Sequence, residues 1–486
     1  MDPSDRPPGP LPAPPLGRSE IALELTVPAA ALSPLRRHLG PVLRRARPII
    51  LTWHDRDAIA LSQGLAVVAW QESRSQGWRA EALRAPIGAP PRRHGEASTL
   101  AGLDLPDLPD GMTPVQGFAG RLRDGTADGV ALRLVAGSLG DAAGPALARL
   151  NLVGTADATV ALAHRLVAEY GLEIATRSLA AEALALAGMD VPGPPLGAPI
   201  LPEGLSPGDC FAHAAMHLIG VVLHHAPAAA AGETGEPVHQ IRVALRRLRS
   251  LTGLFRDAIA GAEVAALRPA LKTLATALGP ARDLDVFLAG TGRALSAAFP
   301  DETVLEALIA AATQRRAEAY AGLATLLSGP ALHGLALQVA VLDQLRPWPW
   351  PAGPPDTMAL ATTLLARCRR QVVRRKADPA GLSEDALHQL RLKAKCLRYA
   401  AEVFAPLCPG GRARRFLKHV AALQEALGRL NDGVVAAGLM HDLAFAGGTG
   451  LAGGMVRGYV AAHAGNARTA SARAWRRLRK AELFWA

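Results

Sequence analysis

Two stretches of the chain, VHQIRVALRRLR at residues 238–249 and LHQLRLKAKCLR at residues 387–398, are nearly the same and lie 149 residues apart. The same offset separates Phe255 from Phe404 and Asp283 from Asp432. A constant offset over about 45 residues is typical of a duplicated structural unit. The sequence therefore predicts one helical unit that occurs twice.

Helical periodicity places the basic residues of each stretch on one face. At about 100° per residue, the basic positions of the first stretch fall within an arc of about 80°, opposite Ile241 and Leu248. These positions are His239, Arg242, Arg246 and Arg249 in the first copy and His388, Arg391, Lys395 and Arg398 in the second. A row of donors spaced by about one 5.4 Å turn suits a polymeric anion. We expect both rows to line one shared surface, with Arg247 at its edge or in a salt bridge.

The positive charge of the chain is confined to its C-terminal part. Residues 1–200 hold 19 basic and 20 acidic side chains, whereas the remainder holds 34 basic and 22 acidic ones. A field of this sign attracts polyanions but does not select among them. Inorganic polyphosphate and nucleic acid are therefore both candidates on charge alone.

Composition sets the outer bounds. A chain of 486 residues is long enough for two or three domains, each with its own core. The cysteines at positions 210, 368, 396 and 408 form no C-x-x-C pair, which favours reduced thiols in a cytoplasmic protein. No apolar run reaches the length of a membrane span, so we expect no membrane partner. Abundant Ala, Leu, Gly, Pro and Arg indicate a GC-rich, bacterial genome.

The pattern of residues changes along the chain. Residues 1–19 are rich in proline and predict a disordered leader, and residues 20–190 predict an α+β domain. Residues 191–205 form a linker, and residues 206–486 predict an all-α domain whose two halves span about 206–345 and 355–486. The expected strands are Ile21–Val27, Pro48–Trp53, Leu65–Gln71, Trp78–Leu83, Val130–Val135 and Ala148–Val153, and the expected helices among them are Pro28–Arg47 and Ala158–Tyr170.

The helical part resembles the CHAD domain, a conserved-histidine α-helical module with an internal duplication. The matching segments are Val238–Arg249, Leu278–Val286, Leu387–Tyr399 and Leu423–Asp432, together with the closing segment Trp475–Trp485. They span most of residues 206–486. The resemblance implies a pair of four-helix units around a basic cleft that binds inorganic polyphosphate.

Residues 20–190 resemble the CYTH family, whose members form a β-barrel tunnel and hydrolyse or cyclise triphosphates with a metal ion. The cues are EIALEL from Glu20, WHDR from Trp53, GLAV from Gly64 and TRSLA from Thr176. Tunnel positions that are charged in the family differ here. They read Glu20, Ala22 and Glu24 on the first strand, Val68 and Trp70 on a middle strand, Arg149 and Asn151 on a late strand, and Leu179 after Ser178.

These differences bear on catalysis. Magnesium requires oxygen ligands, and phosphoryl transfer requires basic groups that stabilise the developing charge. Glu20 and Asp55 could still hold Mg²⁺ or Mn²⁺ if the domain were active, but the basic side of the tunnel is nearly lost. We therefore expect a degenerate, β-barrel-like scaffold without catalytic residues, metal ligands or a cofactor.

The sequence thus predicts a polyphosphate-binding protein, with polyphosphate granules as a further partner. The expected binding residues are His239, Arg242, Arg246, Arg247, Arg249, His388, Arg391, Lys393, Lys395, Arg398, Arg415 and Lys418. Asp283 and Asp432 are expected to cap a helix or to orient an arginine. One alternative is a metal-dependent triphosphatase or polyphosphatase, which needs clustered carboxylates and basic residues inside the barrel. Another is a nucleic-acid-binding protein, which needs base-stacking aromatic side chains in the cleft.

Overall fold

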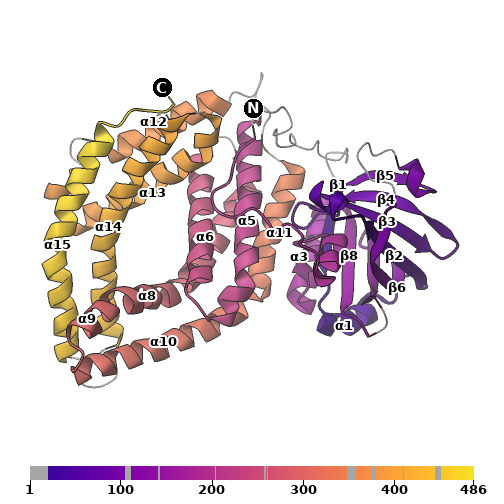
Figure 1. Cartoon of the computed structure of the whole chain (residues 1–486), viewed down its shortest axis with the longest axis horizontal. Helices are drawn as coiled ribbons and strands as arrows, with labels where there is room; N and C mark the ends of the chain where they lie inside the picture. The colour runs from indigo at the N-terminus through magenta and orange to yellow at the C-terminus, as the bar shows by residue number, and fades with distance from the viewer. Residues whose placement is uncertain are drawn as a thin grey trace. The chain divides into compact units, whose positions relative to one another are not determined.

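The computed structural model describes residues 20–485, apart from residues 104–110, 141–142, 203, 257–258, 260, 347, 349–356, 375–377, 409 and 444–449. The predicted leader, residues 1–19, lies outside the described residues. The chain divides into two compact units (Figure 1). We call them the sheet unit, residues 20–195 and 329–346, and the helical unit, residues 196–328 and 348–485.

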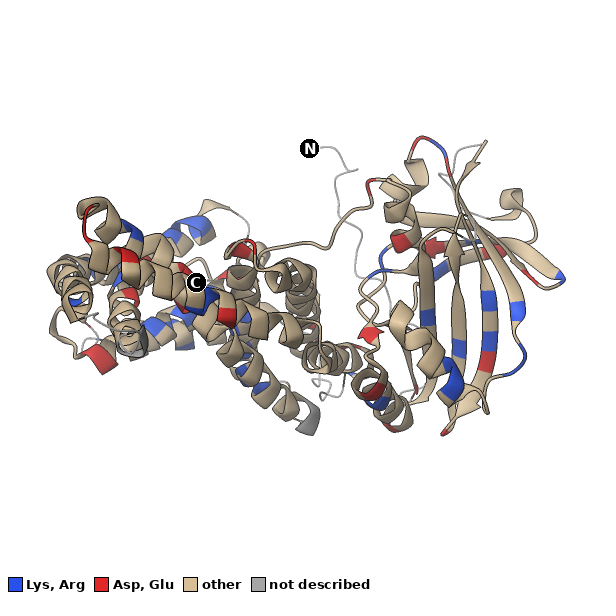
Figure 2. Cartoon of the chain, turned by 90° about the horizontal axis from the view of Figure 1, so that it is seen from below, with Lys and Arg blue, Asp and Glu red and all other residues tan. Residues whose placement is uncertain are grey.

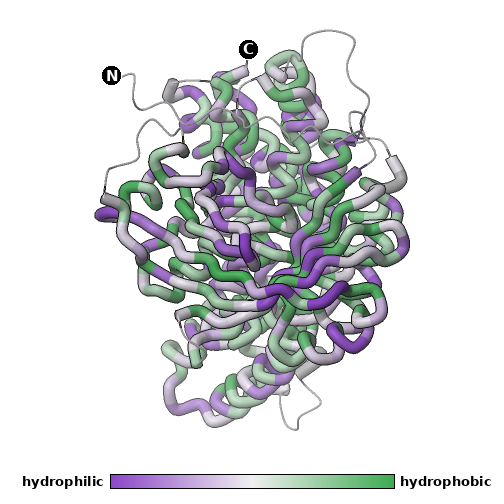
Figure 3. Tube along the Cα trace, turned by 90° about the vertical axis from the view of Figure 1, so that its right-hand side faces the viewer, coloured by the Kyte–Doolittle hydropathy of each residue, from purple (hydrophilic) through white to green (hydrophobic). Residues whose placement is uncertain are grey.

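Nine antiparallel strands form one sheet in the order β5-β4-β3-β2-β6-β7-β8-β1-β9. Their bounds are β1 Glu20–Thr26, β2 Arg47–Asp55, β3 Leu65–Glu72, β4 Ser75–Ala82, β5 Arg93–Ala97, β6 Thr113–Ala127, β7 Val130–Leu139, β8 Ala146–Thr155 and β9 Glu173–Ile174. The strands carry both hydrophobic and hydrophilic residues (Figure 3), and burial alternates along β2, where every second residue from Ile49 to Asp55 is buried. Apolar clusters lie on both faces of the sheet, because the adjacent residues Val67 and Val68 of β3 belong to different clusters.

The sheet is open, so the predicted barrel-like closure is wrong. A barrel requires its two edge strands to pair with each other. Here the edges are β5 and β9, and no backbone pairing joins them within the described residues. β9 has only two residues, and they pair with Leu25 and Thr26 of β1. A strand of this length cannot supply the second ladder that closure needs.

Six short helices accompany the sheet. They are α1 Ala29–Leu39, α2 Ile59–Ser62, the 3₁₀ turn η2 Leu100–Gly102, α3 Ala156–Tyr170, α4 Leu179–Leu186 and α11 Pro330–Leu345. Side chains of α4 join the main core of the sheet, which includes Trp53, Val68 and Phe118. This helix therefore covers the apolar face of the central strands.

α11 comes from the middle of the helical sequence but packs in the sheet unit, against α3, β1 and β9. The side chain of Gln344 accepts a hydrogen bond from the Ala22 N–H at 3.0 Å and donates one to the Ala22 carbonyl at 2.9 Å. Gln344 thereby provides hydrogen-bond partners for backbone groups of β1 that β9 is too short to reach. The compact helical unit thus differs in this segment from the range expected from the sequence, which ran to residue 345.

The helical unit contains the remaining helices (Figure 1). Its first part consists of α5 Pro207–Ala231, α6 Glu236–Leu254, α7 Ala262–Ala277, α8 Gly279–Phe287, the π-helical turn η3 Leu288–Gly292, α9 Arg293–Ala298 and α10 Thr303–Leu327. Its second part consists of α12 Thr357–Val372, the 3₁₀ turn η5 Pro379–Gly381, α13 Glu384–Phe404, the 3₁₀ turn η6 Ala405–Leu407, α14 Gly411–Leu443 and α15 Gly450–Arg479.

The two repeated stretches lie on neighbouring helices, α6 and α13. Their apolar faces are buried as the periodicity predicts, with Ile241 and Leu248 fully buried on α6. The matched residues Phe255 and Phe404 follow these faces, and their ring centroids lie 5.9 Å apart. Burial of the apolar faces directs the basic faces of α6 and α13 away from the core. The duplication itself stays a prediction.

One helix of the described chain, α5, is long and apolar enough to cross a membrane by length and composition. Half of its most apolar window is buried inside the protein, which is typical of a core helix. α10 and α11 pass the same test only when they are counted together as one span.

Candidate anion-binding site

Side chains from α6, α8 and α13 form one group of five cations, which we call the basic cluster. It comprises Arg242, Arg246, Arg282, Arg391 and Lys395. Members of the two predicted rows lie close enough to shift one another's pKa, since Arg246 and Arg391 both act on Arg242 and on Lys395. The fold therefore brings the centres of the two rows together. α8 contributes because it packs against α6 and α14.

Lys395 lies at the most enclosed point of the basic cluster, with 7% of its surface exposed. Its pKa is lowered from 10.5 to about 7, mainly by burial and then by the positive charges of Arg246, Arg391 and Arg242, against a smaller opposite effect of Asp432. Burial is also the largest cause of the lowered pKa of Arg242 and of Arg391. The cluster thus concentrates positive charge where water compensates it poorly.

The cluster has few partners of opposite charge. Within the described residues, Arg246, Arg282, Arg391 and Lys395 make no ion pair within 4.0 Å, and Arg242 donates one hydrogen bond, to the Ala275 carbonyl at 3.2 Å. The Nε atoms of Arg246 and Arg391 are buried and have no hydrogen-bond partner. A buried donor without an acceptor is costly. The cluster is therefore suited to an anion that supplies acceptor oxygens.

The sheet unit provides a contrast. Both basic and acidic residues occur on its strands (Figure 2), and several of them pair, as Arg133 does with Asp124 at 2.9 Å. Exposed pairs of this kind compensate their own charge. The five cations of the basic cluster lack such compensation.

Two carboxylates, Asp283 and Asp432, lie near the basic cluster. Burial raises the pKa of both, while Arg242 lowers that of Asp283 and Arg391 lowers that of Asp432. The proposed capping role is wrong, because Asp283 lies inside α8 and Asp432 inside α14. Their orientation of the neighbouring arginines stays a prediction.

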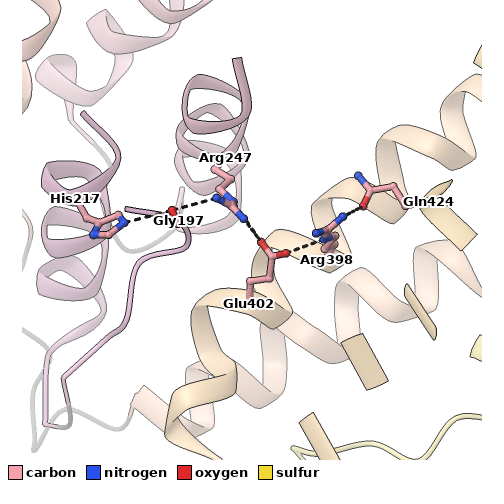
Figure 4. A network of polar contacts seen from close by, with 6 residues as sticks. All are labelled: Gly197, His217, Arg247, Arg398, Glu402 and Gln424. Carbon is pink, nitrogen blue, oxygen red and sulfur yellow. Dashed lines mark hydrogen bonds and ion pairs between the residues drawn. The ribbon is translucent and has the colours of Figure 1, made fainter. Parts of the chain in front are cut away.

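Two predicted binding residues, Arg247 and Arg398, are instead engaged by a carboxylate (Figure 4). Glu402 accepts hydrogen bonds from Arg247 Nη2 at 2.8 Å and from Arg398 Nε at 2.7 Å. Arg247 also donates to the Gly197 carbonyl at 3.1 Å, and Arg398 donates to Gln424 Oε1 at 2.9 Å. The predicted salt bridge of Arg247 is confirmed. These two guanidinium groups are largely committed to the fold.

The other predicted residues lie around the cluster or apart from it. His239 is half-buried, and burial, followed by the charge of Arg282, lowers its pKa below 6.5. Its counterpart His388 is exposed. Arg249, Lys393 and Lys418 are exposed too, and Arg415 lies 3.7 Å from Glu482. Lys418 borders a shallow hollow of about 540 Å³ together with Arg398 and Arg414.

Arg282 belongs to the cluster but was absent from the predicted set. It influences the pKa of His239, Arg242, Asp283 and Asp432. A signal was present, because Arg282 directly precedes Asp283 in the LGPARD segment that supported the family resemblance. The second copy has Asn431 at the same offset, so the two halves of the site are not equivalent.

The interior of the sheet offers no comparable group. Val68 is buried in the apolar core, and Trp70 and Leu179 pack against it. Arg149 is 3% exposed and pairs with Glu24 and Glu182. Burial raises the pKa of Glu24 to about 7, although Arg149 opposes this. The basic charge on this face is therefore neutralised within the sheet unit.

The two carboxylates considered as metal ligands do not form a site. Asp55 accepts hydrogen bonds from the N–H groups of Ala60 at 3.0 Å and Leu61 at 3.1 Å, so both of its oxygens hold the first turn of α2. Glu20 is exposed at the start of β1. Over the described residues, no three side chains of His, Cys, Asp or Glu come together as metal ligands would.

Comparison with known proteins identifies the helical part. Residues 213–441 match the family model of the CHAD domain and form a CHAD domain. The crystal structure of the CHAD domain from the plant Ricinus communis is similar, at 26% sequence identity and a TM-score of 0.51, over 60% of this chain and 98% of that chain. The predicted resemblance to this family is therefore confirmed.

Two further solved structures are less alike. PptA from Streptomyces chartreusis shares 22% identity at a TM-score of 0.40, over 55% of this chain and 99% of that chain. A putative adenylyl cyclase from Hippeastrum, described as having a dominant triphosphatase activity, shares 13% identity at a TM-score of 0.29, over 36% of this chain and 98% of that chain. No curated protein matches the chain.

Proposed function

We propose that the protein binds inorganic polyphosphate at the basic cluster. The observation that carries this proposal is the pair of buried Nε atoms, on Arg246 and Arg391, without a hydrogen-bond partner among the described residues. An arginine fork matches two phosphate oxygens, and a bound phosphate would satisfy both donors. The two rows belong to different helices, so successive phosphates of one chain can contact both.

Nucleic acid fits the same surface less well. Single strands bind proteins largely through bases stacked on accessible aromatic rings. Tyr399 acts on the pKa of Arg391, but its ring is buried, and its centroid lies 5.7 Å from the guanidinium carbon of Arg247. It is therefore unavailable to a base. This favours a phosphate chain without bases.

A competition assay tests the assignment. Labelled long-chain polyphosphate is bound to the full-length protein and displaced at fixed ionic strength by unlabelled polyphosphate or by single-stranded RNA, compared at equal phosphate concentration. We expect polyphosphate to displace the label at a concentration at least about tenfold lower than RNA. Both polymers release counterions and depend on salt, so only their ratio is informative. Equal displacement would favour the nucleic-acid alternative.

We further propose that the sheet unit is a non-catalytic scaffold. The apolar core that contains Val68 and the ion pairs of Arg149 support this, because the resemblance to the CYTH family implies charged tunnel groups at these positions. The rival function is a metal-dependent inorganic triphosphatase. It would require Mg²⁺ or Mn²⁺ and basic groups that face an open tunnel.

We expect no metal-dependent hydrolysis of tripolyphosphate or nucleoside triphosphates above the background of a matched Glu20→Gln/Asp55→Asn variant. Released phosphate is measured with Mg²⁺ and with Mn²⁺, because either ion could serve a hard oxygen site. A metal-dependent rate that the double variant abolishes would establish the triphosphatase instead.

The proposals on cofactor, location and partners follow from polyphosphate binding and from the non-catalytic sheet unit. A polyphosphate-binding protein needs no cofactor, and we propose a cytoplasmic location with polyphosphate granules as partners. We also propose that the segments containing α6 and α13 arose by duplication. The equal offsets of the basic residues support this, as does the contact between Phe255 and Phe404.

A further inference from the structure

A second basic surface lies on α15, apart from the residues considered so far. Its exposed cations follow one face of the helix at helical spacing and line a hollow of about 400 Å³ beside η5. They are Arg473, Arg476, Arg477 and Lys480. We call this surface the α15 face.

Most of the charge on the α15 face is uncompensated. Arg476 pairs with Asp378 at 3.3 Å. Arg473, Arg477 and Lys480 make no ion pair with any carboxylate in the part of the chain that the structure describes. Cations in the last turn of a helix also interact with its dipole, but Arg473 precedes that turn. Interaction with the helix dipole therefore explains the positions of only some cations of the α15 face.

The α15 face is held on a fixed support. The opposite side of α15 is buried, with Trp475 at 1% exposure donating a hydrogen bond from Nε1 to the Val372 carbonyl at 2.8 Å. Arg468 donates to the Leu382 carbonyl at 2.6 Å, which joins α15 to the segment between η5 and α13. The α15 face thus belongs to a firmly packed helix, so the backbone loses little conformational freedom when a ligand binds.

The α15 face lies near the start of α13, the helix that carries Arg391 and Lys395 of the basic cluster. Arg391 is seven residues from the first residue of α13, or about 10 Å along the helix axis. Two carboxylates, Glu384 and Asp385, occupy the first turn of α13. They give the start of α13 a negative charge, and we therefore treat the α15 face and the basic cluster as two separate sites.

We propose that the α15 face is a second binding site for the inorganic polyphosphate chain, and that one long chain engages it together with the basic cluster. The inference rests on the proposed function of the cluster. The hollow is lined by cations, alanines and Thr469, with no aromatic ring on which a base could stack. Two linked sites make the second contact intramolecular, which raises the affinity for chains long enough to span them.

The test compares tripolyphosphate with long-chain polyphosphate on the full-length protein. We expect Arg473→Gln/Arg477→Gln to weaken long-chain binding by about tenfold or more and to leave tripolyphosphate binding within about twofold of wild type. The matched control is Arg293→Gln/Arg457→Gln, which removes two exposed arginines of the same unit that border none of the described hollows. Glutamine keeps the helix propensity, and thermal unfolding checks the fold.

Two results would overturn the second site. One is a long-chain affinity equal to that of the control pair, while the wild-type protein still binds the polymer. The other is a variant that loses RNA binding but keeps polyphosphate binding. Failure of the primary proposal looks different, because wild type would then bind neither phosphate ligand, or Arg242→Gln/Arg391→Gln would bind both as well as wild type.

Discussion

Arg242→Gln/Arg391→Gln is expected to weaken polyphosphate binding by about two orders of magnitude or more, for both short and long chains. A hydrogen bond to a charged group contributes about 1.5–3 kcal/mol, and 1.4 kcal/mol corresponds to a factor of about ten in affinity. Both guanidinium groups are partly buried in the basic cluster, where phosphate contacts replace little water. Isothermal titration calorimetry measures the two affinities directly.

General attraction is controlled by the Arg293→Gln/Arg457→Gln pair, which loses the same formal charge from exposed positions. Long-range attraction changes about equally in both double variants. The difference between them therefore isolates the contacts made in the cluster. Equal losses would reduce the cluster to one part of a diffuse basic surface.

Lys395→Met is expected to stabilise the protein at pH 7 while it weakens polyphosphate binding. The unfolded chain keeps Lys395 protonated up to its usual pKa of 10.5, whereas the folded protein begins to release the proton near pH 7. Folding thus opposes the charged form, at a cost on the order of a few kcal/mol. Methionine has a similar length and carries no charge, so it removes this cost.

The sign of the pH dependence follows from the same group. Between about pH 7 and 10.5 the unfolded state holds more protons at Lys395, so this lysine makes the wild-type protein more stable as pH rises. Bound phosphates favour the charged lysine, so affinity is expected to fall as pH increases above 7. The charged groups that act on Lys395 are Arg246, Arg391, Arg242 and Asp432. His239, with a lowered pKa, adds a further gain in affinity only below pH 6.5.

The exposed Lys393 is the matched control, two residues earlier on the same helix. Lys393→Met is expected to change neither the free energy of unfolding nor its pH dependence appreciably, because the side chain is already in water. Chemical denaturation at pH 7 and pH 9 measures both variants. A Lys395→Met protein less stable than wild type at pH 7 would show that the lysine is compensated in the folded state.

The centre of the site could be predicted because it depends on local periodicity. The apolar positions of α6 and α13 determine which face is buried, and this directs Arg242, Arg246, Arg391 and Lys395 to the other side. Arg282 could not be placed in the same way, since it approaches from α8 and its position depends on tertiary packing.

Residues at the ends of the rows were harder to predict. Arg398 forms a salt bridge with Glu402, one turn later on the same helix. The i,i+4 spacing of the two residues in the sequence indicates this pairing. Arg247 reaches the same carboxylate from a different helix, and only the fold decides this. A helical wheel assigns a side chain to a face but does not show which partner it meets there.

In the sheet unit, too, the sequence predicts local elements but not how they pack together. Most expected strands are present because alternation of buried and more exposed residues is a local property, as in β2. Closure of the sheet and the position of α11 are non-local. Leu332, Leu335 and Leu342 of α11 are buried, but an apolar helix face does not specify which unit will cover it.

The most direct test of the account is an experimental structure of the full-length protein with bound tripolyphosphate. We predict that phosphate oxygens lie within about 3 Å of the Nε atoms of both Arg246 and Arg391, two buried donors of the basic cluster that have no partner among the described residues. Phosphate bound elsewhere, with these two atoms still unsatisfied, would contradict the proposed site.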